Sequence, residues 1–484
     1  MLIRPVQRPT LRSAWHGQAL PSFIQNFLML KPPTARLLAT LIGCALLSGV
    51  ARVEAATSSS QPPAAPVETV VTPGSPAQPS APGSSSWPAT GATVSGMEEF
   101  DRQFSELLNR WKVPGASIAI MTNGRPVFVR GYGWSDVEKQ EKVEPSSLFR
   151  IAGVSIPLTA VAVLRLVQDG KLTLEQKALD LFQDLQPCQG SIADKRFELI
   201  TIQQLLQMSG GWNSKVSGDP GEKPYIFLAA RDCKIAPPAD VDTTIRYMLG
   251  RTLDFGPGTD FAYSNFAYTM LGRIIEKASG QSYEEYVRKQ ILAPAGITRM
   301  QCARTRVSAR APGEVCYYPF PGQPPVASPF PGDKGLVPAP YGCFNLEAHA
   351  ASGGWIATAV DLLRFAACLA GEGMSPSPLS AETMATMTAR PAIPRWKDTD
   401  AYFAMGWEVR PQADGRSATR SKDGGMPGSM AFLIRRYDGI AWAVVFNSRP
   451  EEKDEFMREV KDTVWRAIND QHQWPPYYGF KDYP

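Results

Sequence analysis

The sequence predicts an α/β domain in which an antiparallel sheet is flanked by helices, with an all-helical region in between. Three observations carry this prediction. The start of the domain has the pattern of a helix followed by a hairpin, and its end has the pattern of strands followed by a helix. Between the two, apolar residues recur at helical spacing. We expect the domain to occupy residues 97–470, with a tail at 471–484.

The helix and the hairpin come first along the domain. Apolar residues recur at helical spacing from Met97 to Trp111, which predicts an amphipathic helix. The next two apolar runs, 116–121 and 126–130, flank Asn123-Gly124. An Asn-Gly pair between two such runs is the strongest short signal for a hairpin.

The end of the domain supplies more strands and a last helix. We expect strands at 406–410, 430–436 and 440–447, and a helix at 452–469. Asp438-Gly439 predicts the turn that joins the last two strands. The two ends of the domain therefore supply the sheet together.

The middle of the domain is expected to be helical. Helices are predicted at 158–168, 201–208, 263–278 and 283–291, and Gly170 is a stop signal for the first of these. Residues 300–352 are rich in Pro and Gly and predict a long irregular insertion. Such insertions often form the wall of a binding site.

Residues 1–55 have the pattern of a secretory signal peptide. Basic residues from Lys31 precede an apolar run at 37–50, and the small-residue exit ends at Ala55. The run is about 14 residues long, shorter than the roughly 20 of a membrane-spanning helix. We therefore expect no transmembrane helix and an exported protein, periplasmic or secreted. Met29 could be the true start, and the lipobox-like sequence before Cys44 leaves a lipid anchor open.

Residues 56–96 are rich in Pro, Ser and Ala and predict a flexible linker. The formal charge of +4 belongs to the targeting region, because residues 1–55 carry six basic side chains and one acidic one. Without them the charge is −1, which argues against a nucleic-acid partner. The six cysteines beyond Cys44 allow 15 disulfide pairings, and no Cys or His spacing indicates a metal. His349 is expected to be structural or exposed.

Four motifs occur in a characteristic order: residues 148–152, residues 201–206, Tyr263-Ser264-Asn265 and residues 424–428. Together they resemble the serine beta-lactamase and penicillin-binding-protein superfamily, in particular its class C-like branch with esterases and D-aminopeptidases. The resemblance implies a beta-lactamase/transpeptidase-like fold, with the active site between the helical region and the sheet. It also implies acyl transfer without a cofactor, by a serine and a lysine three residues later.

This sequence departs from the motif at both of those positions. Gly153 stands where the nucleophilic serine belongs, and Ile156 stands where the lysine belongs. Ser155 is a poor substitute, because two residues on a helix correspond to about 200° of rotation. A serine at 155 therefore points away from whatever position 153 faces.

Other parts of the motif set are retained. The resemblance implies that Tyr263 is the general base or proton relay, Asn265 the residue that bonds the substrate amide, and Lys422 the cation that faces the substrate carboxylate. It places the oxyanion hole at the backbone N–H groups of Gly153 and Gly425. Backbone donors survive the loss of a side chain.

The first functional hypothesis is an exported pseudoenzyme that binds a small molecule, such as a cell-wall peptide or an ester, in the inherited cleft. The first alternative is an active hydrolase of beta-lactamase, D-aminopeptidase or esterase type. It would use Ser155, or a water activated by Tyr263 and Lys422. The second alternative is a structural module of the cell envelope.

Overall fold

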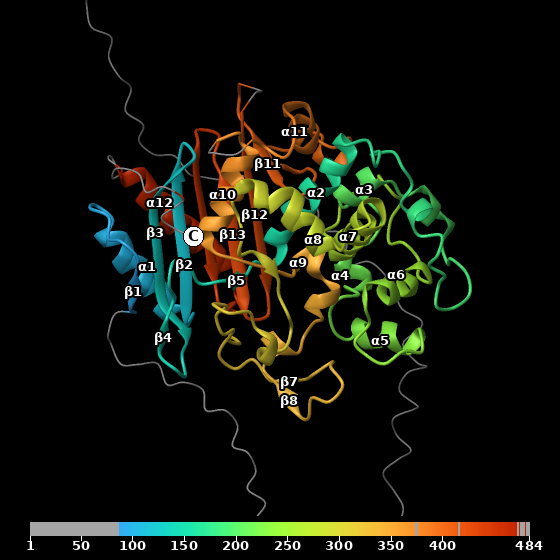
Figure 1. The fold of residues 1–484 in the computed structure, drawn as a ribbon, viewed down its shortest axis with the longest axis horizontal. Helices are drawn as coiled ribbons and strands as arrows, with labels where there is room; N and C mark the ends of the chain where they lie inside the picture. Colours follow the sequence, from blue (N-terminus) through green and yellow to red (C-terminus); the bar gives the residue numbers. More distant parts are fainter. Residues whose placement is uncertain (1–86, 373–375, 415–416, 472–473, 475–479, 481–484) are drawn as a thin grey trace, which may run out of the picture. The chain divides into compact units, whose positions relative to one another are not determined.

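In the computed structural model the described residues are 87–372, 376–414, 417–471, 474 and 480. The predicted signal peptide, Cys44 and most of the predicted linker lie outside them. The principal sheet is antiparallel and has the strand order β1-β3-β2-β14-β13-β12-β11-β10, with β4 paired to β3 (Figure 1). Its strands are β1 Ala89–Thr90, β2 Gly115–Thr122, β3 Arg125–Asp136, β4 Glu141–Lys142, β10 Tyr402–Phe403, β11 Glu408–Pro411, β12 Ala418–Met426, β13 Ser429–Arg435 and β14 Ile440–Phe446.

The two predicted hairpins lie side by side in this sheet. β14 pairs with β2 over the whole length of β14, from Ile440 opposite Thr122 to Phe446 opposite Ala116. The Asn123-Gly124 turn has positive φ at both residues, 47° and 73°, as a type I′ hairpin requires. The prediction that both ends of the domain build one sheet is confirmed.

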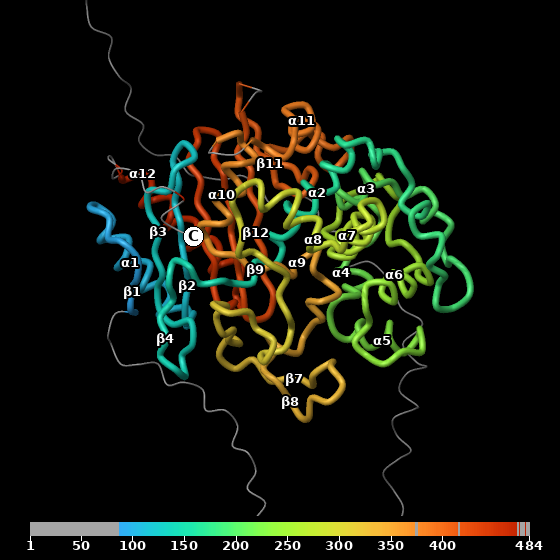
Figure 2. The backbone as a smooth tube through the Cα atoms, in the orientation of Figure 1, coloured from blue at the N-terminus to red at the C-terminus, as the bar shows by residue number. Residues whose placement is uncertain are grey.

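Successive side chains of β2 point to opposite faces of the sheet, and each face packs against its own hydrophobic core. Ile118 and Ile120 face α1 Glu98–Arg110 and α12 Lys453–Asp470, which cover one side. Ala119 and Met121 face the opposite core. Figure 2 shows α1 and α12 together at one side of the sheet and the helical region at the other. Both predicted helices are confirmed to within a residue or two at each end.

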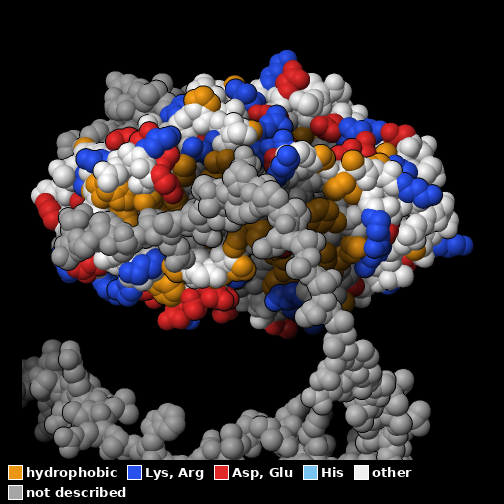
Figure 3. Space-filling view, turned by 90° about the horizontal axis from the view of Figure 1, so that it is seen from below, with side chains coloured by type: hydrophobic (Ala, Val, Ile, Leu, Met, Phe, Trp, Pro, Cys, Tyr) orange, Lys and Arg blue, Asp and Glu red, His pale blue; other side chains and the backbone are white. Residues whose placement is uncertain are grey.

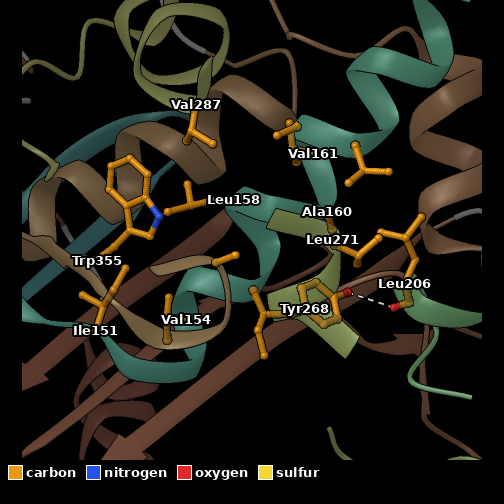
Figure 4. Packing of buried hydrophobic residues seen from close by; sticks show 14 of the residues in the cluster. Ile151, Val154, Leu158, Ala160, Val161, Leu206, Tyr268, Leu271, Val287 and Trp355 are labelled. Carbon is orange, nitrogen blue, oxygen red and sulfur yellow. Dashed lines mark hydrogen bonds between the residues drawn. The ribbon is translucent and has the colours of Figure 1, made fainter. Parts of the chain in front are cut away.

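The second core lies under α2 Ile156–Gln168, α7 Asn265–Ser279 and α10 Ala359–Leu369. Figure 4 shows Val154 and Leu158 packed beside Trp355, with Tyr268 nearby. The Tyr268 hydroxyl donates a hydrogen bond to the Leu206 carbonyl oxygen at 2.8 Å. This packing fixes the start of α2, which is where the missing motif residues lie.

The helical region also contains α3 Ile202–Leu206, α4 Ser214–Ser217, α5 Tyr225–Asp232, α6 Val241–Leu249, α8 Tyr283–Val287, α9 Ala350–Gly353 and α11 Ala381–Thr388. A disulfide joins Cys188 to Cys233, which directly follows α5, so two of the six cysteines are bonded. The other cysteines of the described chain, Cys302, Cys316, Cys343 and Cys368, are free.

Residues 300–352 are mostly irregular, as predicted, with short pieces of structure. β6 Gln301–Cys302 and β5 Phe149–Arg150 pair with β9 Trp355–Ala357, and β7 Val326–Ala327 pairs with β8 Leu336–Val337. The fully buried Arg150 ties this insertion together, because its guanidinium donates to the carbonyl oxygens of Pro340 and Arg304 at 2.7 and 2.8 Å.

The structure corrects two predicted boundaries. The linker was expected to reach residue 96, but Ala89–Thr90 pairs with β3 and Val94 is buried, so the ordered domain begins earlier. The predicted tail begins with Gln471, whose side-chain amide donates to the Ser95 carbonyl oxygen at 3.2 Å. Trp474 packs against the core under α1 and α12. Residues 89–94 of the predicted linker and Gln471 and Trp474 of the predicted tail therefore contribute to the domain.

Across the described residues, no helix combines the length and the apolar character needed to cross a membrane. Figure 3 shows acidic and basic side chains interspersed over the face that it presents.

Candidate functional site

Gly153 lies in the 3₁₀ turn Ala152–Ser155 that leads directly into α2. A Cβ atom placed on Gly153 would lie 2.9 Å from the Tyr263 hydroxyl oxygen, 3.3 Å from Lys422 Nζ and 3.1 Å from the Asp423 carbonyl oxygen. The position of the missing serine therefore faces the retained tyrosine and lysine, as the motif order requires. The phenol and the ammonium group border the space that a serine side chain would take.

Strand β12 brings Lys422 next to Gly153 because the strand passes very close to the turn Ala152–Ser155. A Cβ on Gly424 would lie 2.3 Å from the Gly153 backbone nitrogen, so only glycine permits the approach. Lys422 and Gly424 are two residues apart and share a face of the strand. The strand therefore presents the Lys422 side chain to the same turn.

Lys422 is a buried cation with a single hydrogen bond among the described residues. Its side chain is 7% exposed, and Nζ donates to the Asp423 carbonyl oxygen at 2.5 Å. No carboxylate of the described chain lies within ion-pair distance of it. Burial lowers the pKa of the Lys422 ammonium, which Asp423 and Glu408 partly oppose. An anionic ligand group would restore the missing counter-charge.

Tyr263 lies just outside α7, which corrects the predicted start of that helix. The helix begins at Asn265, because the Ser264 hydroxyl caps it by accepting a hydrogen bond from the Ala267 backbone N–H. Tyr263 is 38% exposed, while its hydroxyl lies next to the buried Gly153. Loss of water around the phenol raises the pKa of Tyr263 above its ordinary value of 10.0, and the negative charge of Asp219 is the second cause of this rise. Tyr263 is therefore a proton donor at neutral pH.

Asn265 is oriented by an acidic residue that the sequence did not indicate. Its side-chain Nδ2 donates to Asp219 Oδ2 at 2.7 Å, and Asp219 Oδ1 accepts from the Gly221 backbone N–H at 2.9 Å. The amide of Asn265 keeps its oxygen and its second N–H for other partners.

Ile156 and Ser155 both point into the protein. Ile156 is fully buried in the core around α2. Ser155 is also fully buried, and its hydroxyl oxygen accepts a hydrogen bond from the Trp355 backbone N–H at 3.3 Å. The prediction that Ser155 faces away from position 153 is confirmed.

Gly425 is exposed, and the Arg449 side chain lies beside it. A Cβ on Gly425 would meet Arg449 Cδ at 3.3 Å. Arg449 follows strand β14 in the loop before α12. Burial lowers the pKa of the Arg449 guanidinium, and the negative charge of Glu222 opposes this shift in part. Arg449 Nε is buried and has no hydrogen bond among the described residues.

The loop before α5 carries a second acidic residue, Glu222, which sequence reasoning also missed. The side chain is exposed, yet the protein around it and the nearby Asp219 raise its pKa above 4.5. His349 packs against this loop and is 8% exposed, so it is buried rather than exposed. Glu222 and His349 are single residues far apart in the sequence, and no motif or spacing in the sequence indicates that they lie close together.

Comparison with known families agrees with this geometry. A profile of the family described as beta-lactamase matches residues 100–463, which is most of the domain. The chain belongs to the beta-lactamase family. Among curated proteins, this beta-lactamase-family chain is 29% identical to protein flp of Staphylococcus aureus strain COL over 236 residues. The aligned region covers 49% of this chain and 44% of protein flp. It is also 29% identical over 197 residues to esterase EstB of Burkholderia gladioli, covering 41% and 49%. The matched region thus spans less than half of these relatives.

Solved structures show the same beta-lactamase fold. A penicillin-binding-protein homologue from Pyrococcus abyssi aligns with a TM-score of 0.58 at 23% identity, over 76% of this chain and 77% of that one. A D-amino acid amidase from Ochrobactrum anthropi aligns with a TM-score of 0.56 at 20% identity, over 77% and 98%. The predicted beta-lactamase/transpeptidase-like fold is confirmed.

The described part of this beta-lactamase-family chain holds no cluster of His, Cys, Asp or Glu able to bind a metal ion. Its site offers the Tyr263 phenol and the buried Lys422 ammonium beside Gly153, with the Arg449 side chain beside Gly425. These groups can bind and polarise a carbonyl or carboxylate.

Proposed function

We propose that this beta-lactamase-family protein is an exported pseudoenzyme that binds a small ligand, a peptidoglycan-like peptide or an ester, in the inherited cleft. The observation that carries the proposal is the environment of Gly153. Tyr263 and Lys422 surround a position without a nucleophile, and the neighbouring Ile156 has no proton-accepting group. Binding groups are retained while the atoms that form an acyl-enzyme are missing.

The contacts of Ser155 support the loss of acyl-enzyme chemistry. A buried hydroxyl that accepts a hydrogen bond from the Trp355 backbone cannot reach a carbonyl in the cleft without breaking the start of α2. A hydrolase that uses water activated by Tyr263 and Lys422 remains the alternative, because both groups border the same space.

Three measurements on purified chain 57–484 test the proposal. A fluorescent penicillin should leave no covalent adduct by mass spectrometry, and nitrocefin and p-nitrophenyl esters should be hydrolysed no faster than in buffer. Peptidoglycan fragments should bind reversibly, and Lys422→Met should weaken the binding of those that carry a carboxylate. An acyl group on Ser155, or turnover that Tyr263→Phe abolishes, would replace the proposal with an active hydrolase.

A further inference from the structure

Lys422 places a primary amine next to the position that the missing serine would occupy. Its Nζ lies 3.3 Å from the position of a Cβ on Gly153, and the Tyr263 hydroxyl oxygen lies 2.9 Å from the same position. The hydroxyl of a serine at 153 would extend from that Cβ by one covalent bond. An amine and a phenol therefore border the place of the absent nucleophile.

The surroundings of Lys422 favour the uncharged amine. The side chain is 7% exposed, and its Nζ donates a hydrogen bond to the Asp423 carbonyl oxygen. No carboxylate of the described chain lies within ion-pair distance of it. A buried ammonium without a counter-charge either binds an anion or loses its proton. Burial lowers the pKa of Lys422, so it is a free amine more often than an exposed lysine is.

Tyr263 lies where it can exchange protons with this amine. Lys422 Nζ is 5.2 Å from the centroid of the Tyr263 ring, and the hydroxyl of that ring lies beside Gly153. The raised pKa of the phenol keeps its proton in place at neutral pH. Tyr263 is also the more exposed of the two side chains, at 38%, so it separates the buried amine from solvent.

We propose that the Lys422 amine forms a reversible imine with small aldehydes, with Tyr263 as the proton donor. The nitrogen lone pair attacks the carbonyl carbon, a C–N bond forms, and the π electrons move to the oxygen, which takes up a proton released by the nitrogen. The Tyr263 hydroxyl then protonates the carbinolamine hydroxyl, which leaves as water while the C=N bond forms. The last N–H proton returns to the Tyr263 oxygen.

This reaction consumes one amine and one aldehyde and yields one imine and one water. Desolvated lysines are the residues that typically form Schiff bases with carbonyl compounds. The activity goes beyond the proposed ligand binding, because it needs neither the serine nor the lysine that the family motif has lost.

Reductive trapping on purified chain 57–484 tests the inference. Propanal with excess sodium cyanoborohydride at pH 7 should leave a propyl group on Lys422, read by peptide mass spectrometry. Lys422 should be alkylated about tenfold more than the exposed Lys215 and Lys453, because one pKa unit changes the fraction of free amine tenfold. Tyr263→Phe should slow trapping at Lys422 about a hundredfold, as expected for loss of a general acid, and leave Lys215 and Lys453 unaffected.

Lys422→Arg is the matched variant, because it keeps the positive charge and removes the primary amine. It should lose the propyl mark at position 422 and still bind peptidoglycan fragments that carry a carboxylate. Lys215→Gln should change neither result. Alkylation of Lys422 no greater than that of Lys215, in a folded protein that binds the fragments, would overturn the inference and leave the proposed function standing. If Lys422 is alkylated and the fragments do not bind, the proposed function fails and the inference stands.

Discussion

A side chain at position 153 would enter a space with polar walls. The Tyr263 hydroxyl and Lys422 Nζ are the ends of flexible side chains and can yield by a few tenths of an ångström, whereas the Asp423 carbonyl oxygen cannot. A serine at 153 therefore needs the Tyr263 hydroxyl and Lys422 Nζ to move, and its Cβ stays in a tight contact of 3.1 Å with the Asp423 carbonyl oxygen. Position 156 is harder to change, because a lysine there enters a fully buried apolar site.

We predict that Gly153→Ser combined with Ile156→Lys restores measurable ester hydrolysis, while either change alone restores far less. A serine without the lysine lacks its proton acceptor, and a lysine without the serine has nothing to activate, so the effects are not additive. The lysine should cost a few kcal/mol of stability. The measurement is p-nitrophenyl-ester turnover on variants shown to be folded by circular dichroism. A folded double variant as inert as the parent would mean that the cleft has lost more than two side chains.

The buried His349 makes stability depend on pH. Burial lowers the pKa of its imidazole below 6.5, and Asp219 opposes this only in part. Between the lowered value and 6.5, the unfolded chain binds a proton that the folded chain does not. The free energy of unfolding should therefore fall as the pH falls through this window, by at most about 1.4 kcal/mol per pH unit. His349→Gln should flatten this slope in urea unfolding from about pH 7 to about pH 5. An unchanged slope would contradict the prediction.

Of the site residues, those in motifs were predictable, and those in isolated positions were not. Tyr263, Asn265 and Lys422 stand in patterns whose order carries information. Asp219, Glu222 and Arg449 are single charged residues in loops, and the contacts of Asp219 with Asn265 and of Arg449 with Gly425 exist only in the folded chain. A lone charge in a loop is most often solvated, so no pattern singles it out.

At the scale of elements, the hairpins and long amphipathic helices were predictable because the turn chemistry and the apolar period agree. Strand β12 was not found from its apolar pattern. Its segment Ala418–Met426 contains Lys, Asp and two Gly and no alternation of apolar side chains, because one part of it serves the site instead of the core. The family resemblance indicated the strand where the periodicity did not.

The disulfide is the covalent link of the helical region. Cys188 and Cys233 are 45 residues apart, and by chain entropy a loop of this length contributes about 4 kcal/mol. Replacing both cysteines with alanine should lower the free energy of unfolding by up to that amount, measured by urea denaturation. The parent protein in reducing buffer should match the variant, and reductant should leave the variant itself unaffected. Equal stability of parent and variant would show that the bond contributes nothing.

At the scale of the whole molecule, the predicted signal peptide, the charge distribution and the disulfide favour the same compartment. Disulfides persist in oxidising environments outside the cytosol. We predict that cells expressing the full chain export a protein that begins near Ala56, as read by amino-terminal sequencing. A diacylated Cys44 would instead indicate a lipoprotein. A cytoplasmic product that begins at Met1 or Met29 would contradict export.

The pairing of β2 with β14 also sets the order of events during synthesis. The strand at Gly115–Thr122 has its central partner at Ile440–Phe446, so it must wait for more than 300 further residues before its second edge is covered. Until then, two apolar faces of the amino-terminal hairpin lack most of their partners. A chain with this delay carries an incompletely paired sheet during synthesis, and it depends on protection from aggregation along the way.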